Sequence, residues 1–317
     1  MQVNLVEGGL VKRFADAVHK LSTLNNPKLL LAVSGGPDSM ALMLLGNAAL
    51  PDRIAVATVD HQLRADSASE ADYVARLCAE RSIPHHIMRP AKPITGNLQS
   101  EARRARYALL QQTATQVGCD LIATAHHADD QLETLLMRLA RGSGVDGLSG
   151  IRPSKGNIIR PLLEFSKSEL EEICQSADVT PVLDPSNEDT AFDRVAIRAW
   201  LSHEPKLLDA RRATRTASAM RDAGEALTWM TATLATSRIQ RFGEEIQCTV
   251  TDLPHELQRR LVLSSLRLLA PELGIRGDSL ERLIDSLAGG RTTTVGNILC
   301  KGGETWRFTF APPRQNP

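Results

Sequence analysis

The chain alternates short apolar runs with longer segments in which apolar residues recur every three or four positions. The apolar runs have the length and branched composition of buried strands. They lie at residues 29–33, 54–59, 85–88 and 121–124. Helical spacing predicts helices over residues 10–24, from 37, from 67 and over 97–117. This alternation predicts an α/β fold with a doubly wound parallel sheet.

The pattern changes after about residue 206. Amphipathic helices are expected over residues 253–269 and 278–287, and short β stretches over 293–300 and 305–310. We therefore predict two domains, one over residues 1–206 and a smaller, mainly helical one over residues 207–317.

Charge and size narrow the classes of protein that fit. The 317 residues, 42% of them hydrophobic, suffice for two domains. The formal net charge is zero, so nucleic-acid binding would have to use local patches. Residues 194–221 form one such patch, with seven basic residues against two acidic ones. A phosphate-binding surface and a solvated linker helix explain this excess equally well.

The cysteines and the apolar segments bear on the compartment. The five cysteines are scattered without a C-x-x-C pair, which argues against zinc ribbons, iron–sulfur clusters and dithiol redox chemistry and favours a reducing compartment. No apolar stretch approaches membrane-spanning length, and the N-terminus lacks a signal-peptide pattern. We expect a cytoplasmic protein without a membrane partner.

The first candidate site is the loop between the strand at residues 29–33 and the helix from Pro37, with the sequence SGGPDS. Its two glycines let backbone amides approach a ligand, and proline suits the first helical position. A strand, a glycine turn and a helix N-terminus together direct N–H groups and a positive dipole end at an anion. No Gly-Lys-Ser/Thr follows, so the loop is not a Walker A motif and would hold phosphates differently.

The second candidate site lies in the helix that follows the strand at residues 121–124. Apolar residues at helical spacing predict a core-facing stripe. The stripe consists of Leu132, Leu135, Leu136 and Leu139. Asp130 and Glu133 are neighbours on another face, where like charges repel unless a cation lies between them. The pair is either acidic charge placed near a helix N-terminus or a site for a metal or a substrate ammonium. The helix ends at Arg141, before a glycine-rich loop over residues 142–150.

Taken in order, the motifs resemble the tRNA(Ile)-lysidine synthetase family of ATP pyrophosphatases. The SGGPDS loop is shared by several ATP pyrophosphatases, whereas the ordered set is more specific. That set is DHQLR at 60–64, EARRARY at 101–107, HHADDQLET at 126–134, RGSGVDGL at 141–148, RPLL at 160–163, DPSN at 184–187 and R-x-x-I-R at 194–198. Val195 stands where the family usually has Asn, which weakens any role built on that amide, and Gln62 stands where Gly is common.

The resemblance implies an N-type ATP pyrophosphatase fold, which is Rossmann-like, and a ligase activity. Such an enzyme adenylates the C2 carbonyl oxygen of the wobble cytidine in an isoleucine tRNA with a CAU anticodon and releases pyrophosphate. The ε-amine of free L-lysine then displaces AMP and gives lysidine. The implied ligands are ATP, Mg²⁺, lysine and this tRNA, which the second domain would help to bind. The resemblance is compatible with a homodimer.

The resemblance also assigns residues. ATP binding is expected at Ser34, Gly35, Gly36, Pro37, Asp38, Ser39, His61, Arg106 and His126. Asp38 would also hold Mg²⁺, and Asp130 and Glu133 would bind lysine. Either Arg194 or Arg198 would stabilise the α-phosphate as charge develops there, and the sequence does not separate the two.

Two alternatives to this function remain at the level of the sequence. A different ATP pyrophosphatase is one, but thiolases with essential paired cysteines and synthetases with a glutaminase domain do not match the isolated cysteines and the length of this chain. A non-catalytic protein that binds tRNA or nucleotide on the same fold is the other. The intact loop with Asp38 and Ser39 argues against it.

Overall fold

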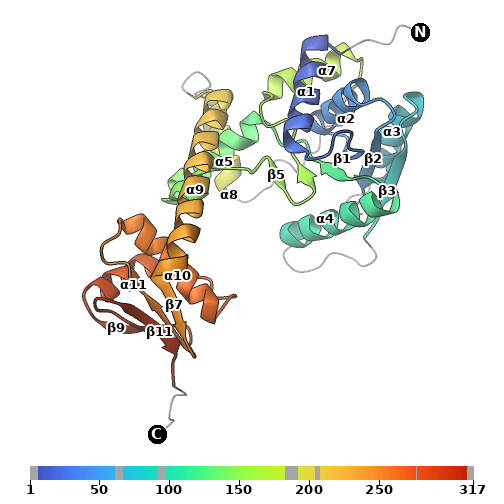
Figure 1. Cartoon of the computed structure of the whole chain (residues 1–317). Helices are drawn as coiled ribbons and strands as arrows, with labels where there is room; N and C mark the ends of the chain where they lie inside the picture. Colours follow the sequence, from blue (N-terminus) through green and yellow to red (C-terminus); the bar gives the residue numbers. More distant parts are fainter. Residues whose placement is uncertain are drawn as a thin grey trace. The chain divides into compact units, whose positions relative to one another are not determined.

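The computed structural model describes residues 6–60, 67–90, 98–182, 192–203, 208–275 and 277–312. The chain separates into two compact units (Figure 1). The first consists of Met1–Gly142 and Gly147–Ser218, and the second of Ser143–Asp146 and Ala219–Pro317. The chain therefore passes between the units in the loop at residues 142–147 and again inside the long helix α9 (Ala210–Arg238).

A six-stranded sheet forms the centre of the first unit, in the order β3-β2-β1-β4-β6-β5. Its strands are β1 (Leu29–Ala32), β2 (Ile54–Val59), β3 (His85–Met88), β4 (Leu121–Ala123), β5 (Ser154–Lys155) and β6 (Ile158–Ile159). All pairings are parallel except that of the edge strand β5 with β6. Leu31 lies opposite Val56 on one side and Ala123 on the other. The predicted doubly wound parallel sheet is confirmed.

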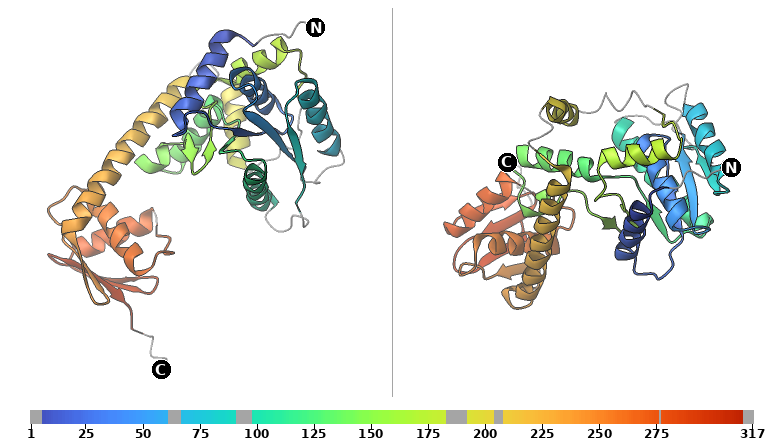
Figure 2. Two further views of the ribbon diagram at one scale, coloured as in Figure 1. Left: turned by 45° about the vertical axis from the view of Figure 1, so that its right-hand side comes forward. Right: turned by 90° about the horizontal axis from the view of Figure 1, so that it is seen from above.

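Helices cover both faces of this sheet (Figure 2). One face packs against α1 (Gly8–Leu21), α2 (Pro37–Ala49), α3 (Ser67–Glu80) and α7 (Lys167–Ser176), and the other face packs against α4 (Leu98–Gln116). The other helices before α9 are α5 (Ala128–Ala140), α6 (Val145–Leu148) and α8 (Phe192–His203). Because strand side chains alternate between faces, Leu29 and Leu31 pack with α1, α2 and α7, whereas Leu30 packs with α4. A strand buried on both faces explains the uninterrupted apolar run in the sequence.

Helix α5 does not pack as the sequence predicts. Leu139 of the expected core stripe is 64% exposed, whereas Gln131 and Glu133 are 1% and 6% exposed. The stripe is buried at Leu132, half-buried at its next two leucines and exposed at Leu139, so the prediction is wrong at its C-terminal end. The reason is that the polar face of α5 has partners. Gln131 bonds the backbone of Ile151, and α8 packs along α5.

The second unit combines helices with a five-stranded antiparallel sheet in the order β7-β8-β11-β10-β9. Besides part of α9, its elements are β7 (Ile239–Phe242), β8 (Glu245–Cys248), α10 (His255–Leu269), α11 (Asp278–Ala288), β9 (Thr292–Val295), β10 (Ile298–Lys301) and β11 (Trp306–Phe310). Trp306, Phe308 and Leu261 lie in its core. The β stretches expected after residue 293 are present, but β7 and β8 were not predicted. None of the described helices is long and apolar enough to cross a membrane.

Candidate active site

The SGGPDS sequence begins in the loop after β1 and continues into the first turn of α2. Gly35 has a φ of +94°, a conformation that favours glycine. The hydroxyl of Ser39 accepts the N–H of Ser34 at 3.1 Å and donates to the carbonyl of Gly36 at 2.9 Å, so it holds the loop in shape. Gly36 is the N-cap residue and has no side chain to cap α2. The first-turn N–H groups of α2 therefore suit an anion.

The site lies at the topological switch point of the sheet. From β1 the chain order runs to β2 and β3 on one side, and β4 and β6 lie on the other. The carboxyl ends of β1 and β4 are therefore adjacent, which is where open α/β sheets bind ligands. The loop after β1 carries Asp38, and the loop after β4 carries His126 and His127.

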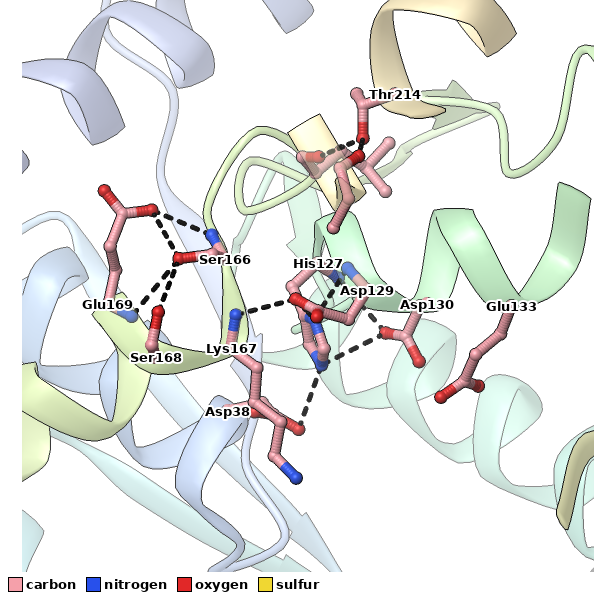
Figure 3. Close-up of polar contacts among 12 residues, drawn as sticks. Asp38, His127, Asp129, Asp130, Glu133, Ser166, Lys167, Ser168, Glu169 and Thr214 are labelled. Atoms are coloured by element: carbon pink, nitrogen blue, oxygen red, sulfur yellow. Dashed lines mark hydrogen bonds and ion pairs between the residues drawn. The ribbon is translucent and has the colours of Figure 1, made fainter. Parts of the chain in front are cut away.

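Asp38 points from the first turn of α2 toward the start of α5 (Figure 3). Its Oδ2 lies 3.5 Å from Nε2 of His127. Its Oδ1 is buried and makes no hydrogen bond within the described part of the chain. A buried carboxylate oxygen without a partner costs about 1–3 kcal/mol or more, which a bound cation would offset. Asp38 therefore fits a metal-binding role.

His127 is a site residue that the sequence prediction did not include. It is the N-cap of α5 and only 5% exposed, with Nε2 between Asp38 and Asp130 and Nδ1 3.5 Å from Asp129. Burial alone lowers the pKa of His127, but hydrogen bonds to Asp129 and Asp38 and the charge of Asp130 outweigh it and raise the pKa to about 10. The ring is thus a cation at neutral pH. Its place directly before an acidic first turn was the available sequence signal.

Asp130 and Glu133 share a cation, as their spacing suggests, and that cation belongs to the chain. Nε of Arg198 lies 2.5 Å from Oε1 of Glu133, and Nη2 lies 4.0 Å from Oδ1 of Asp130. The hydrogen bond to Glu133 raises the pKa of Arg198. Asp130 also accepts the backbone N–H of His127 at 3.1 Å at the start of α5. Asp130 therefore serves the helix N-terminus and the cation site together.

The remaining predicted residues are not all brought to this point. Nδ1 of His126 bonds Oγ1 of Thr124 at 3.0 Å, at the end of β4. Burial lowers the pKa of Arg106 in α4, and this side chain forms no ion pair within the described residues, so it is suited to an anion. His61 lies outside the described residues, and so does the side chain of Arg194, although α8 includes that residue.

Comparisons with known proteins show which family the chain belongs to. A PP-loop domain family model matches residues 10–204. A tRNA(Ile)-lysidine synthase of Zymomonas mobilis is 41% identical over 305 residues, which cover 93% of this chain and 92% of that protein. The chain belongs to the tRNA(Ile)-lysidine synthase family. Another member, from Novosphingobium aromaticivorans, is 40% identical over 302 residues, with 91% and 90% coverage. The family membership inferred from the ordered motifs is confirmed.

A solved structure of a U34-tRNA thiolase from Methanococcus maripaludis shares the fold. It covers 68% of this chain and 80% of its own, with a TM-score of 0.55 and 18% identity. The cysteines of the present chain do not suit thiolate chemistry. Cys78, Cys174 and Cys300 are buried, and burial raises the pKa of each thiol to about 12. Within the described residues, no three His, Cys, Asp or Glu side chains form a metal-binding group.

Proposed function

We propose that this protein is the ATP-dependent ligase that converts the wobble cytidine of an isoleucine tRNA with a CAU anticodon to lysidine. One observation carries the proposal. At the switch point, the N-terminus of α2 has no side-chain cap, and Oδ1 of Asp38 is buried without a hydrogen bond from the described residues. His127 lies between Asp38 and Asp130 and so connects this region to the acidic pair on α5. An anion site next to a cation site matches a reaction between ATP and an amine. The curated relatives carry the name of this enzyme.

In the adenylation half, the loop amides would bind the pyrophosphate part of ATP. Asp38 would hold Mg²⁺, which would neutralise phosphate charge. Mg²⁺ needs few protein carboxylates, because phosphate oxygens and water complete its coordination shell. His61, Arg106 and His126 would complete the ATP site. The C2 oxygen of the cytidine would attack the α-phosphorus as the bond to the β-phosphate breaks, and pyrophosphate would leave. Arg194 or Arg198 would stabilise the charge that develops.

In the transfer half, Asp130 and Glu133 would bind lysine. Because Arg198 already pairs with Oε1 of Glu133, we propose that a lysine ammonium takes its place and that the released guanidinium then reaches the α-phosphate. The ε-amine must lose a proton before it attacks. One carboxylate would therefore hold the α-ammonium while the other accepts the ε-proton. The amine displaces AMP from C2 and forms the carbon–nitrogen bond.

The tRNA would be bound by more than the catalytic centre. We propose a catalytic domain over residues 1–206 and a C-terminal domain over 207–317 that contacts tRNA, with the basic segment 194–221 on the phosphates. The scattered free cysteines support a cytoplasmic location. A homodimer is a hypothesis that sedimentation tests.

Incubation with ATP, isotopically labelled lysine and unmodified isoleucine tRNA tests the proposal. We expect label in the RNA, together with AMP and pyrophosphate in equal amounts. A methionine tRNA with the same anticodon is the matched substrate control, and it should take up far less label. Unlabelled RNA, or ADP and phosphate as the main products, would contradict the proposed function.

A further inference from the structure

Asp129 has no role in the reaction proposed above, yet it contacts both helix α7 and His127 (Figure 3). Its Oδ2 accepts the backbone N–H of Lys167 at 2.8 Å and lies 3.5 Å from Nδ1 of His127. Lys167 is the first residue of α7, whereas Asp129 lies in the first turn of α5. One carboxylate therefore joins the N-termini of two helices to the ring of His127.

Helix α7 has its own N-terminal cap and does not depend on Asp129 alone. The hydroxyl of Ser166 accepts the N–H of Glu169 at 3.4 Å, and Glu169 accepts the N–H of Ser166 at 2.8 Å. Helix α7 also packs against α2, where the thiol of Cys174 donates to the carbonyl of Pro37 at 3.4 Å. The N–H of Lys167 is thus held relative to the start of α2, and it fixes Asp129 in turn.

Fixing Nδ1 of His127 also determines where Nε2 points. The ring is 5% exposed, and Nε2 lies 3.5 Å from Oδ2 of Asp38 and 3.6 Å from Oδ2 of Asp130. A neutral ring would use Nδ1 to accept the N–H of Asp129 at 3.3 Å and Nε2 to donate. Asp129 thus contacts Nδ1 through its carboxylate when the ring is protonated and through its backbone N–H when the ring is neutral. The two carboxylates that Nε2 faces come from α2 and α5.

We propose that Asp129 is a positioning residue that acts through His127. It keeps Nε2 between Asp38 and Asp130, so that the ATP side and the lysine side of the site are held at a fixed separation. This inference rests on the proposed function, because that function places ATP at Asp38 and lysine at Asp130. Asp129 itself touches neither substrate.

Two substitutions of Asp129 separate its contacts. Asp129→Asn keeps an oxygen that can accept the N–H of Lys167 but removes the charge beside His127, and Asp129→Ala removes both. We expect each to slow AMP release at saturating ATP, lysine and tRNA by about 10- to 100-fold, the usual effect of losing an orienting partner. The KM values for ATP and lysine should change less than about threefold, because uniform substrate binding is untouched.

A double-mutant cycle with His127→Asn tests whether Asp129 acts through the ring. Asn keeps an N-cap acceptor for α5, so the helix start is preserved. In the His127→Asn background, Asp129→Asn should slow the reaction by less than about twofold, because the group it orients is gone. A full Asp129→Asn effect in that background would overturn the inference.

Ser166→Ala and Glu171→Gln are the controls. The first removes a cap of α7 without touching Asp129, and the second removes the exposed carboxylate that pairs with Lys167 in the same helix. Both should react at the wild-type rate. A Ser166→Ala enzyme as slow as Asp129→Asn would overturn this inference and leave the proposed function intact. So would an Asp129→Asn enzyme that reacts at the wild-type rate. A wild-type enzyme that attaches no lysine overturns the proposed function and this inference with it.

Discussion

At the scale of single residues, the site is a chain of charges that satisfy one another. Asp38 and Asp130 both face the protonated His127 ring, and Glu133 faces Arg198. Glu133 is 6% exposed, and the ion pair with Arg198 offsets part of the cost of burying its carboxylate. Removing one member therefore leaves its partners with less compensation for their burial. Substitutions that keep the shape of the side chain are therefore the informative ones.

Glu133→Gln should weaken the use of lysine while ATP binding survives. Removing one charge-assisted hydrogen bond from a closed site costs about 1.5–3 kcal/mol, or roughly ten- to a hundredfold in the KM for lysine. The measurement is the lysine dependence of lysidine formation, with ATP binding followed separately by equilibrium dialysis. If the lysine requirement is unchanged, the carboxylate pair serves only the helix and the lysine site is elsewhere.

At the scale of elements, a few side chains fix the helices around the sheet. Glu169 of α7 lies 2.6 Å from Nη1 of Arg13 in α1 and 2.6 Å from Nη2 of Arg211 at the start of α9. Arg13 also stacks on Phe165 at 4.2 Å. In α5, the side-chain amide of Gln131 bonds both the N–H and the carbonyl of Ile151. These contacts connect helices that are far apart in the sequence.

The contribution of Glu169 to stability should depend on pH. Burial raises the pKa of Glu169, but Arg13 and Arg211 outweigh burial and lower the pKa from 4.5 to about 2. A depressed folded-state pKa stabilises the fold above the unfolded value of about 4.5, and this stability is lost as the pH falls through about 2. At pH 7 the free energy of unfolding of the wild type should exceed that of Glu169→Gln by on the order of 1–2 kcal/mol, allowing for solvent screening.

Urea unfolding of both proteins at a series of pH values measures this difference. It should be constant above about pH 5 and shrink steadily below it, because the carboxylate is progressively protonated. Lys167→Gln, which removes an exposed partner of Glu171, is the control and should show no comparable change with pH. A wild-type advantage that stays constant down to about pH 2.5 would contradict the assigned ion pairs.

Gly150→Ala should destabilise the first unit more than Gly156→Ala. Both glycines have a positive φ, +65° and +59°, so alanine strains both backbones. A Cβ at Gly150 would also lie 2.5 Å from Oε1 of Gln131, whereas a Cβ at Gly156 meets nothing within 4 Å. We expect a loss of about 1–2 kcal/mol at Gly156 and about 1–3 kcal/mol more at Gly150, measured by urea unfolding. Equal losses would show that Gln131 moves aside freely.

At the scale of the whole molecule, two connections join the units along the chain. One is α9, and the other is the loop whose residues Ser143–Asp146 belong to the second unit. There Asp146 pairs with Arg260 of α10 at 2.8 Å, and Arg260 also bonds Glu256 at 2.7 Å. The glycine-rich loop is thus a structural part of the second unit as well as the continuation of α5.

Binding of tRNA should weaken steeply with salt if the basic segment contacts phosphates. Arg212 and Arg215 are exposed on α9. Each arginine that contacts a phosphate contributes about one unit to the slope of log K against log salt, so the double substitution to Gln should reduce the slope by up to about two. Fluorescence anisotropy with labelled tRNA measures it. Lys20→Gln in α1 is the matched control, and a slope equal to that of wild type in the Arg212/Arg215 variant would place the contacts elsewhere.

Most elements of the first unit and the position of the glycine loop could be predicted from the sequence. Apolar runs mark strands because a strand buried on both faces needs them, and glycine and proline mark the loop before α2 because no other residues suit its backbone as well. β7 and β8 were not predicted because each has few apolar residues, which alternate over a very short stretch. In β8 the buried residues are Ile246 and Cys248. Strands so short lack a periodic signal.

Only the tertiary structure decided which groups meet at the site. Local spacing made a shared cation at Asp130 and Glu133 one of two explanations, but Arg198 lies 65 residues from Glu133 in the sequence. The burial of Gln131 and Glu133 in α5 likewise depends on distant neighbours, which are α8 and Ile151. The pKa of His127 is raised in part by Asp38, which lies on another helix. Periodicity reports the geometry within one element. Burial and pKa depend on neighbours that chain folding brings in from a distance.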